Sequence, residues 1–312
     1  MGFFDEAQEV FDKGRSAAKG AVSSVAVEKH AFVREFVRMC TDAYLQGWHE
    51  RNGGNLSYRM SAEEASSCRT FFYTTPSSWV ALDVVAPEMA GEFLLVSATG
   101  VHMRNVASDV ISSLGIVEID ASGASWRVMW GFKGGGMPTS ELSAHVLCYA
   151  AAKRRVAQTS YAKEHVDAPD MRVMYHAHPS NAIALSCVMP LNSATVTRAL
   201  WTCTSESVIA FPEGVAVLPW ICPGSPELAQ ASARLIEEGF NLVLLAQHGV
   251  FVAGENLDEA FGRVQAIEKA AEVYMRARAL CKSTELVHTL TLDNVREIAA
   301  RYKLSLNEDL LD

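Results

Sequence analysis

The sequence has no hydrophobic run long enough to cross a membrane. Among its 312 residues, no stretch approaches the roughly 18 to 20 uninterrupted apolar residues that a membrane-spanning helix needs. The first residues, MGFFDEAQEVFDKGR, carry acidic side chains where a secretory signal peptide would be apolar. We therefore expect a cytoplasmic protein with no membrane partner.

Paired cysteines and clusters of basic residues are also missing. The seven cysteines are an odd, scattered set without a Cys-x-x-Cys pair, at positions 40, 68, 148, 187, 203, 222 and 281. This pattern argues against a disulfide framework and against a zinc ribbon. The formal net charge is −9, and a nucleic-acid-binding surface would need a basic footprint that the sequence lacks. No nucleic-acid partner is expected, and an anionic substrate must be held by local groups.

Apolar residues are abundant, and their spacing predicts both helices and strands. Hydrophobic residues make up 49% of the chain, which is enough for a full core. Apolar residues at intervals of three and four, with end signals, predict helices over 30–48, about 139–153, 180–188, 226–239 and 257–280. Short apolar or alternating runs predict strands over 93–97, 115–119, 126–130, 172–178, 207–211, 215–219 and 241–246.

The chain shows no internal repeat, low-complexity linker or break in composition. We therefore expect one α/β domain over residues 29–282. Residues 1–28 have helix-like spacing interrupted by glycine and are interpreted as an N-terminal extension. Residues 283–312 are interpreted as a helical tail packed on the domain.

Two histidines of one predicted strand form a candidate metal-binding pair. In the segment YHAHP, His176 and His178 stand at positions i and i+2, so both imidazoles project from the same face of the strand. His248 follows the apolar run NLVLLA and precedes Gly249. Three imidazoles would leave one open position on a tetrahedral zinc ion. By itself, the His-x-His pattern also suits ordinary surface or hydrogen-bonded histidines.

A carboxylate and two turns are further candidates. Glu141 of the segment PTSEL lies in the first predicted turn of a helix, where Thr139 or Ser140 can cap the free amides, so it is either a reactive acid or a capping acid. The segments RNGGN (51–55) and SATG (97–100) are polar turns with glycine. Backbone N–H groups of such turns can hold a phosphate, although each is equally an ordinary tight turn.

Taken in order, these segments resemble the class II aldolase and adducin-head family. The resemblance rests on GWHERNGGNLS (47–57), PTSEL (138–142), HAH (176–178) and QHGVF (247–251), and on LWTCTSESVIAFPEGVAVLPWICPG and LDEAFGRVQAIEKAAEVY, so it runs from about residue 30 to about residue 280. It implies a single domain with a central, largely antiparallel β-sheet flanked by helices. It also implies a metal-dependent carbon–carbon lyase that cleaves a phosphorylated ketose by retro-aldol chemistry.

The resemblance assigns roles to individual residues. It implies that His176, His178 and His248 bind one Zn²⁺ per subunit and that Glu141 is the acid/base next to the metal. It implies a substrate phosphate site made by Asn52, Gly54, Asn55, Thr99, Gly100, Thr139 and Ser140. The family's Gly-Ser-Gly-Lys turn is replaced here by Ala98-Thr99-Gly100-Val101, so the hydroxyl is kept and the lysine is lost.

The resemblance also implies a homotetramer. In the segment SES (205–207), Glu206 matches an acid that the family brings in from a neighbouring subunit to assist proton transfer on the aldehyde side. L-Fuculose-1-phosphate aldolase and L-ribulose-5-phosphate 4-epimerase share the three-histidine site and are the enzymatic alternatives. An adducin-head-like interaction domain is the non-enzymatic alternative, which the three histidines and Glu141 oppose.

The other histidines have simpler interpretations. His145 lies four residues after Glu141 on the same predicted helix face. We expect a packed, hydrogen-bonded histidine there, with a metal ligand as the alternative. His49, His102, His165 and His288 have no ligand spacing and are given no metal role.

Overall fold

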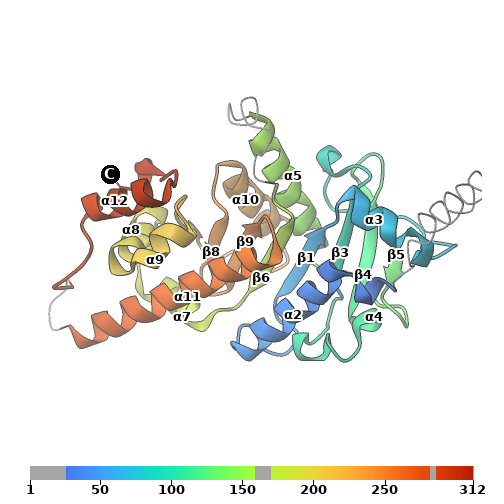
Figure 1. The fold of residues 1–312 in the computed structure, drawn as a ribbon, viewed down its shortest axis with the longest axis horizontal. Coiled ribbons are helices and arrows are strands. Elements are labelled where there is room, and N and C mark those ends of the chain that lie inside the picture. Colours follow the sequence, from blue (N-terminus) through green and yellow to red (C-terminus); the bar gives the residue numbers. More distant parts are fainter. Residues whose placement is uncertain (1–25, 159–169, 282–285, 312) are drawn as a thin grey trace, which may run out of the picture.

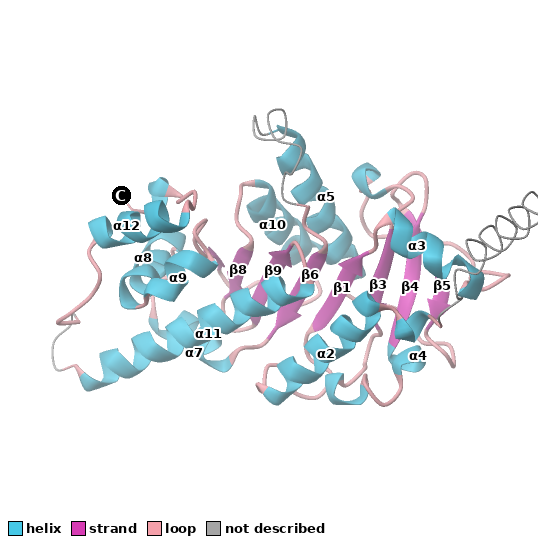
Figure 2. Ribbon diagram, in the orientation of Figure 1, coloured by secondary structure: helices cyan, strands magenta, loops and turns pink. Residues whose placement is uncertain are grey.

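The computed structural model describes residues 26–158, 170–281 and 286–311, and a single mixed sheet runs through the molecule (Figures 1 and 2). The strands of this sheet are β1 Asn55–Arg59, β2 Val80–Ala81, β3 Phe93–Ser97, β4 Leu114–Ile119, β5 Ser125–Gly131, β6 Val173–Ala177, β7 Ala216–Leu218, β8 Leu242–Leu245 and β9 Gly249–Gly254. Their order is β2-β5-β4-β3-β1-β6-β9-β8-β7. All neighbours pair antiparallel except β7 and β8, which confirms the predicted, largely antiparallel sheet.

Helices cover both faces of the sheet. They are α2 Ala31–Leu45, α3 Ala62–Cys68, α4 Val110–Ser113, α5 Leu142–Gln158, α7 Ser180–Val188, α8 Ser193–Cys203, α9 Ser205–Ala210, α10 Pro226–Glu237, α11 Leu257–Leu280 and α12 Leu292–Tyr302. In Figure 1, α2 and α11 cross the near face, and α5 and α10 lie behind the strands. α8, α9 and α12 gather beyond the β7 end of the sheet.

Strand periodicity produces these layers. On β6, Val173 and Tyr175 belong to the core shared with α2 and α11, whereas Met174 belongs to the core shared with α5 and α10. Successive strand residues point to opposite faces, so a strand buried on both sides is largely apolar along its whole length. All five residues of β6 are buried, including His176.

Most predicted elements are present within a few residues of their predicted limits, and one prediction is wrong. The segment SVIAF, residues 207–211, was expected to continue the sheet, but its first four residues belong to helix α9. Val208 and Phe211, three positions apart, are both buried in the core, and the Trp201 indole N–H donates to the Phe211 carbonyl. A short, mainly apolar run fits both the two-residue repeat of a strand and the 3.6-residue repeat of a helix. Here the burial of Val208 and Phe211 favours the helix.

Other predictions concern the two ends of the chain. The expected N-terminal extension falls mainly on residues 1–25, outside the described residues. The expected tail contains the amphipathic helix α12, whose Val295 and Ala299 are buried. The domain limits themselves stay predictions. Within the described ranges, no helix is long and apolar enough to cross a membrane.

Candidate metal centre and active site

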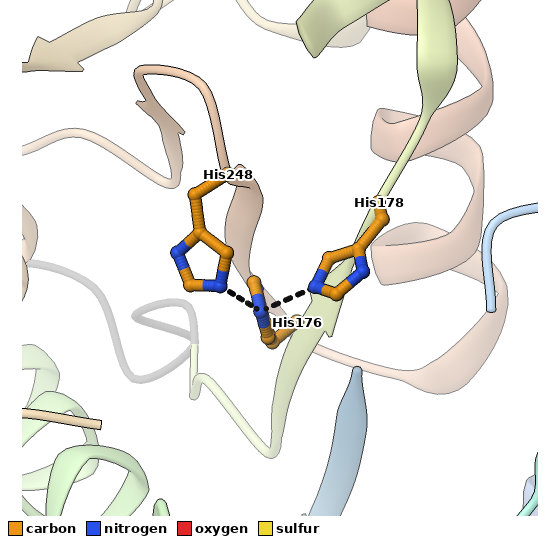
Figure 3. Close-up of side chains that lie close together, drawn as sticks. All are labelled: His176, His178 and His248. Atoms are coloured by element: carbon orange, nitrogen blue, oxygen red, sulfur yellow. Dashed lines mark hydrogen bonds between the residues drawn. The ribbon is translucent and has the colours of Figure 1, made fainter. Parts of the chain in front are cut away.

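Three imidazoles meet at the ends of the central strands (Figure 3). His176 lies in β6, His178 follows that strand, and His248 stands in the turn between β8 and β9. The Nε2 atom of His176 is 3.0 Å from Nε2 of His178 and 3.1 Å from Nε2 of His248. Four-coordinate zinc with Zn–N bonds of about 2.0 to 2.1 Å separates its ligand nitrogens by roughly 3.3 Å, close to these distances.

The pairing of β6 with β9 brings His248 next to His176 and His178. The backbone of Ala177 is opposite Val250, so the start of β9 reaches the end of β6. At Gly249, an added Cβ would be 2.3 Å from the Ala177 carbonyl oxygen and 2.9 Å from the His178 ring. Glycine is therefore needed where the two strand ends cross. The preceding residue, Gln247, has φ of 56° and is held by two hydrogen bonds to Ser186.

The outer contacts of the imidazoles favour metal binding. The Nδ1 atom of His176 lies 2.9 Å from the Val250 carbonyl oxygen, and Nδ1 of His178 lies 2.8 Å from a Glu50 carboxylate oxygen. Both partners are acceptors, so both Nδ1 atoms carry hydrogen, and in the neutral rings both Nε2 atoms present lone pairs to each other. A divalent cation between them satisfies these lone pairs. The donor set of the described chain therefore fits a zinc ion.

Burial favours the neutral form of two of these imidazoles. Desolvation lowers the pKa of His176 well below its ordinary value, and the neighbouring histidines lower it further. Burial also lowers the pKa of His248. A neutral imidazole is the form that binds a metal, so His176 and His248 are in that form near neutral pH.

Glu141 lies in the turn that leads into α5. Its backbone N–H donates to the Thr139 hydroxyl over 3.3 Å, so Thr139 supplies the cap that the sequence predicted. The carboxylate Oε2 accepts a hydrogen bond of 3.0 Å from the Asn55 side-chain amide. Asn55 is the backbone partner of His176 across the pairing of β1 with β6, which brings Glu141 close to the histidines. The carboxylate is thus held by a side chain at the metal site, as a reactive acid requires.

The predicted phosphate residues form two groups. Thr99, Thr139 and Ser140 line one pocket, because the backbone N–H of Thr99 donates to Met137 and that of Thr139 donates to Ser97. These two amides are therefore engaged, and the Thr139 hydroxyl, which accepts from the Glu141 N–H, can still donate its own hydrogen to a ligand. No lysine or arginine is among the described residues that line this pocket. Gly100, with φ of 71°, forms the turn beside Thr99.

The second group is Asn52 and Gly54, in the turn before β1, and Asn55, the first residue of that strand. Gly54 has φ of 73°, and an added Cβ would be 2.4 Å from Nδ1 of His49 and 2.7 Å from the His176 carbonyl oxygen. His49 is buried and bonds the Gly53 carbonyl and the Tyr175 hydroxyl, each over 2.9 Å. The glycine is therefore required for packing, whatever its role towards a substrate.

Glu206 lies apart from these residues. It is exposed on α9 and lines a groove along α11 together with Glu259 and Lys269. The described chain does not bring it to Glu141. A role for Glu206 at a metal centre therefore requires a second copy of the chain.

Sequence reasoning missed two contacts at the site. Glu50, whose carboxylate contacts Nδ1 of His178, comes just before the predicted turn, and no residue spacing in the sequence indicated this contact. Asn55 was expected to contact phosphate, yet it bonds Glu141 and His145. His145 is fully buried and hydrogen-bonded, as expected, and is not a ligand of the three-histidine group.

Known proteins are similar to this chain in sequence and in fold. Residues 34–275 match the model of the family described as Class II Aldolase and Adducin N-terminal domain. A rhamnulose-1-phosphate aldolase of Enterobacter sp. (strain 638) is 36% identical over 90% of this chain and 96% of its own length. One of Salmonella dublin is 39% identical over 78% of this chain and 84% of its own.

A solved structure also matches. The sugar-phosphate aldolase from Thermotoga maritima has a TM-score of 0.61 and 25% sequence identity, and the match covers 80% of this chain and 96% of that one. With the converging histidines and Glu141 in place, the chain belongs to the class II aldolase and adducin family and is one of its enzymes, a class II aldolase.

Proposed function

We propose that this enzyme cleaves L-rhamnulose 1-phosphate into dihydroxyacetone phosphate and L-lactaldehyde, as a step in L-rhamnose catabolism. Relatives that carry the name rhamnulose-1-phosphate aldolase, 36% and 39% identical over most of the chain, support this substrate. The observation that carries the chemistry is the convergence of three imidazoles beside a held carboxylate.

In this proposal His176, His178 and His248 hold one Zn²⁺. When bound, the ion supplies Lewis-acid polarisation of the ketone, which takes the place of a Schiff-base lysine. The support is the geometry of the Nε2 atoms and the lowered pKa of His176 and His248.

Cleavage between C3 and C4 requires two proton transfers. The hydroxyl on C4 must lose its proton to become the aldehyde, and C3 of the ketone fragment must gain one. We assign the transfer at C3 to Glu141, which is fixed beside the histidines by Asn55. We assign help at the C4 hydroxyl to Glu206 of a neighbouring copy in a homotetramer, because Glu206 is exposed and lies apart from Glu141 in its own chain.

The substrate phosphate is assigned to Asn52, Gly54, Asn55, Thr99, Gly100, Thr139 and Ser140. The clustering of Thr99, Thr139 and Ser140 around one pocket supports this assignment. Hydroxyl and amide groups bind a phosphate without a net positive charge, which suits a chain of formal charge −9. The seven cysteines form no disulfide, which suits the reducing cytoplasm where we expect the enzyme to act.

A panel of phosphorylated ketoses tests the substrate. We expect L-rhamnulose 1-phosphate to release dihydroxyacetone phosphate far faster than L-fuculose 1-phosphate or unphosphorylated L-rhamnulose in a coupled assay. The remote phosphate provides binding energy that orients the reacting carbons. A preference for L-fuculose 1-phosphate, or 4-epimerisation of L-ribulose 5-phosphate without cleavage, would overturn the named substrate.

A further inference from the structure

α5 and the turn before it meet one face of β1 in a polar chain whose inner members, His145, Ser57 and Tyr149, have no role in the proposed reaction. Glu141, His145 and Tyr149 are spaced by four residues and share a helix face, and Asn55 and Ser57 are spaced by two and share a strand face. Asn55 joins Glu141 to His145, and Ser57 joins His145 to Tyr149. His145 and Ser57 have no exposed surface, so water cannot replace these contacts.

The partners of His145 determine where its hydrogen lies. Nε2 is 2.5 Å from Oδ1 of Asn55, and Nδ1 is 2.7 Å from Oγ of Ser57. Burial lowers the pKa of His145 to about 4, so the ring is neutral near pH 7 and carries one N–H. An amide oxygen only accepts, so the hydrogen is on Nε2, and Nδ1 accepts from the Ser57 hydroxyl.

The Glu141 carboxylate fixes the same orientation of the Asn55 amide independently, because a carboxylate only accepts hydrogen bonds. With Oδ1 accepting from His145, the Nδ2 group faces Glu141 and donates to its carboxylate over 3.0 Å. The flipped amide would turn its oxygen to the carboxylate and its hydrogens to the Nε2–H of His145. Both contacts would then be repulsive, so only one orientation satisfies the chain.

We propose that His145 is a positioning residue that acts through Asn55 to hold the Glu141 carboxylate at the metal site. The proposal rests on the proposed function in one respect, because it takes Glu141 as the acid/base. The second hydrogen of the Asn55 amide stays available for the substrate, so the assigned substrate contact of Asn55 is compatible with this role.

A packing role is the alternative, since His145 also makes an edge contact with the Phe251 ring at 5.3 Å between centroids. Packing would be preserved by any side chain of similar volume. Positioning needs a hydrogen-bond donor at the place of Nε2. A substitution that keeps the volume of the His145 side chain but removes its hydrogen-bond donor therefore distinguishes a positioning role from a packing role.

The tautomer is tested first, on the unaltered enzyme and without any turnover. Long-range ¹H–¹⁵N spectra distinguish Nε2–H from Nδ1–H imidazole, and the His145 signals are identified by their loss in His145→Gln. We expect the neutral Nε2–H form at pH 7. The Nδ1–H form would overturn the proposal, whether or not the protein proves to cleave L-rhamnulose 1-phosphate.

Two variants of His145 then test the donor. His145→Gln keeps an N–H group within reach of Asn55, whereas His145→Leu removes it, and both deprive Ser57 of its acceptor. We expect kcat to fall roughly tenfold or more in His145→Leu, with KM and zinc content little changed, and to stay within about threefold of wild type in His145→Gln. Equal losses in both variants, matching equal losses of thermal stability, would indicate packing alone.

A double-mutant cycle tests whether the effect passes through Glu141. If it does, adding His145→Leu to Glu141→Gln causes no further loss of kcat, because the carboxylate that His145 positions is already gone. A multiplicative loss would reject the proposal. If the leucine variant does not fold, Ser57→Ala replaces it in the cycle. This substitution keeps the His145 ring but removes the hydroxyl that donates to its Nδ1, so the hydrogen is no longer confined to Nε2. A wild-type enzyme without aldolase activity would instead contradict the proposed function and leave the tautomer result standing.

Discussion

Glu141 is the carboxylate on which the proposed reaction depends. Glu141→Gln keeps the size of the side chain and its contact region with Asn55 but removes the proton-accepting oxygen. We expect kcat to fall roughly 10²-fold or more while the fold and most of the zinc are retained. Glu255→Gln, at an exposed position, serves as the control. Wild-type turnover in Glu141→Gln would return this residue to a structural role at the start of α5.

The three histidines give a prediction about metal content. We expect elemental analysis to find one zinc per chain, and His248→Ala to lose most of that zinc together with activity, because only two ligands remain. His288→Ala is the matched control, since His288 is exposed. Stoichiometric zinc in His248→Ala would show that the metal lies elsewhere.

Two buried histidines give a prediction about stability and pH. Burial lowers the pKa of His49 and of His145 from 6.5 to about 4. Below pH 6.5 the unfolded chain gains protons that the folded chain does not, so the free energy of unfolding falls until pH reaches about 4. Each residue contributes a loss on the order of 3 kcal/mol across this window.

Chemical denaturation of the metal-free protein at several pH values measures this loss. The dependence on pH should be shallower in His145→Gln than in wild type, because one titrating group is gone. Unchanged steepness in that variant would contradict the assigned pKa. His288→Gln, which removes an exposed histidine, should leave the dependence as it is in wild type.

At the scale of an element, the turn before β1 is held by contacts that only glycine permits. In Gly54→Ala the new Cβ would collide with His49 and with the His176 carbonyl, and φ stays near 73°. Gly91 has φ of 75° but open space around it, so Gly91→Ala has the same backbone cost without the collision.

We expect Gly91→Ala to lose about 1 kcal/mol of unfolding free energy and Gly54→Ala to lose roughly 1 to 3 kcal/mol more. Because Gly54 packs against the backbone of His176, a proposed zinc ligand, Gly54→Ala should also bind zinc more weakly. Denaturation curves and competition with a chelator measure the two effects. Equal stability of the two variants would mean that the turn relaxes without cost.

At the scale of the whole molecule, the assigned role of Glu206 requires neighbouring copies. Glu206 lies on α9 and Glu141 before α5, and the described chain keeps them apart. A homotetramer arranged as a ring would bring one copy's Glu206 to the next copy's metal site through head-to-tail contacts.

Mixing two weakly active variants tests this arrangement. When Glu141→Gln and Glu206→Gln are unfolded together and refolded into mixed tetramers, about a quarter of the sites combine an intact Glu141 with an intact Glu206 from the neighbour. Activity should rise towards that fraction of wild type, whereas each variant refolded alone should stay low. A fully active monomer in solution scattering, or no rise on mixing, would contradict the shared site.

The sequence by itself determined the local features of the site. A period of two predicted that His176 and His178 lie on one side of the chain, although β6 ends at Ala177 and His178 follows it, and the start of a predicted helix located Glu141 next to Thr139. Glycine and proline marked the ends of helices such as α7 and α10 within two residues. These features follow from backbone geometry, which depends only on near neighbours in the chain.

Tertiary structure decided the contacts between distant segments. The meeting of His248 with His178 depends on the register of β6 with β9, and the bond from Asn55 to Glu141 depends on how α5 packs on β1. Packing around Trp201 also turned SVIAF from a predicted strand into the end of α9. Periodicity tells which face a side chain is on, but only the burial of that face against a partner tells what it meets.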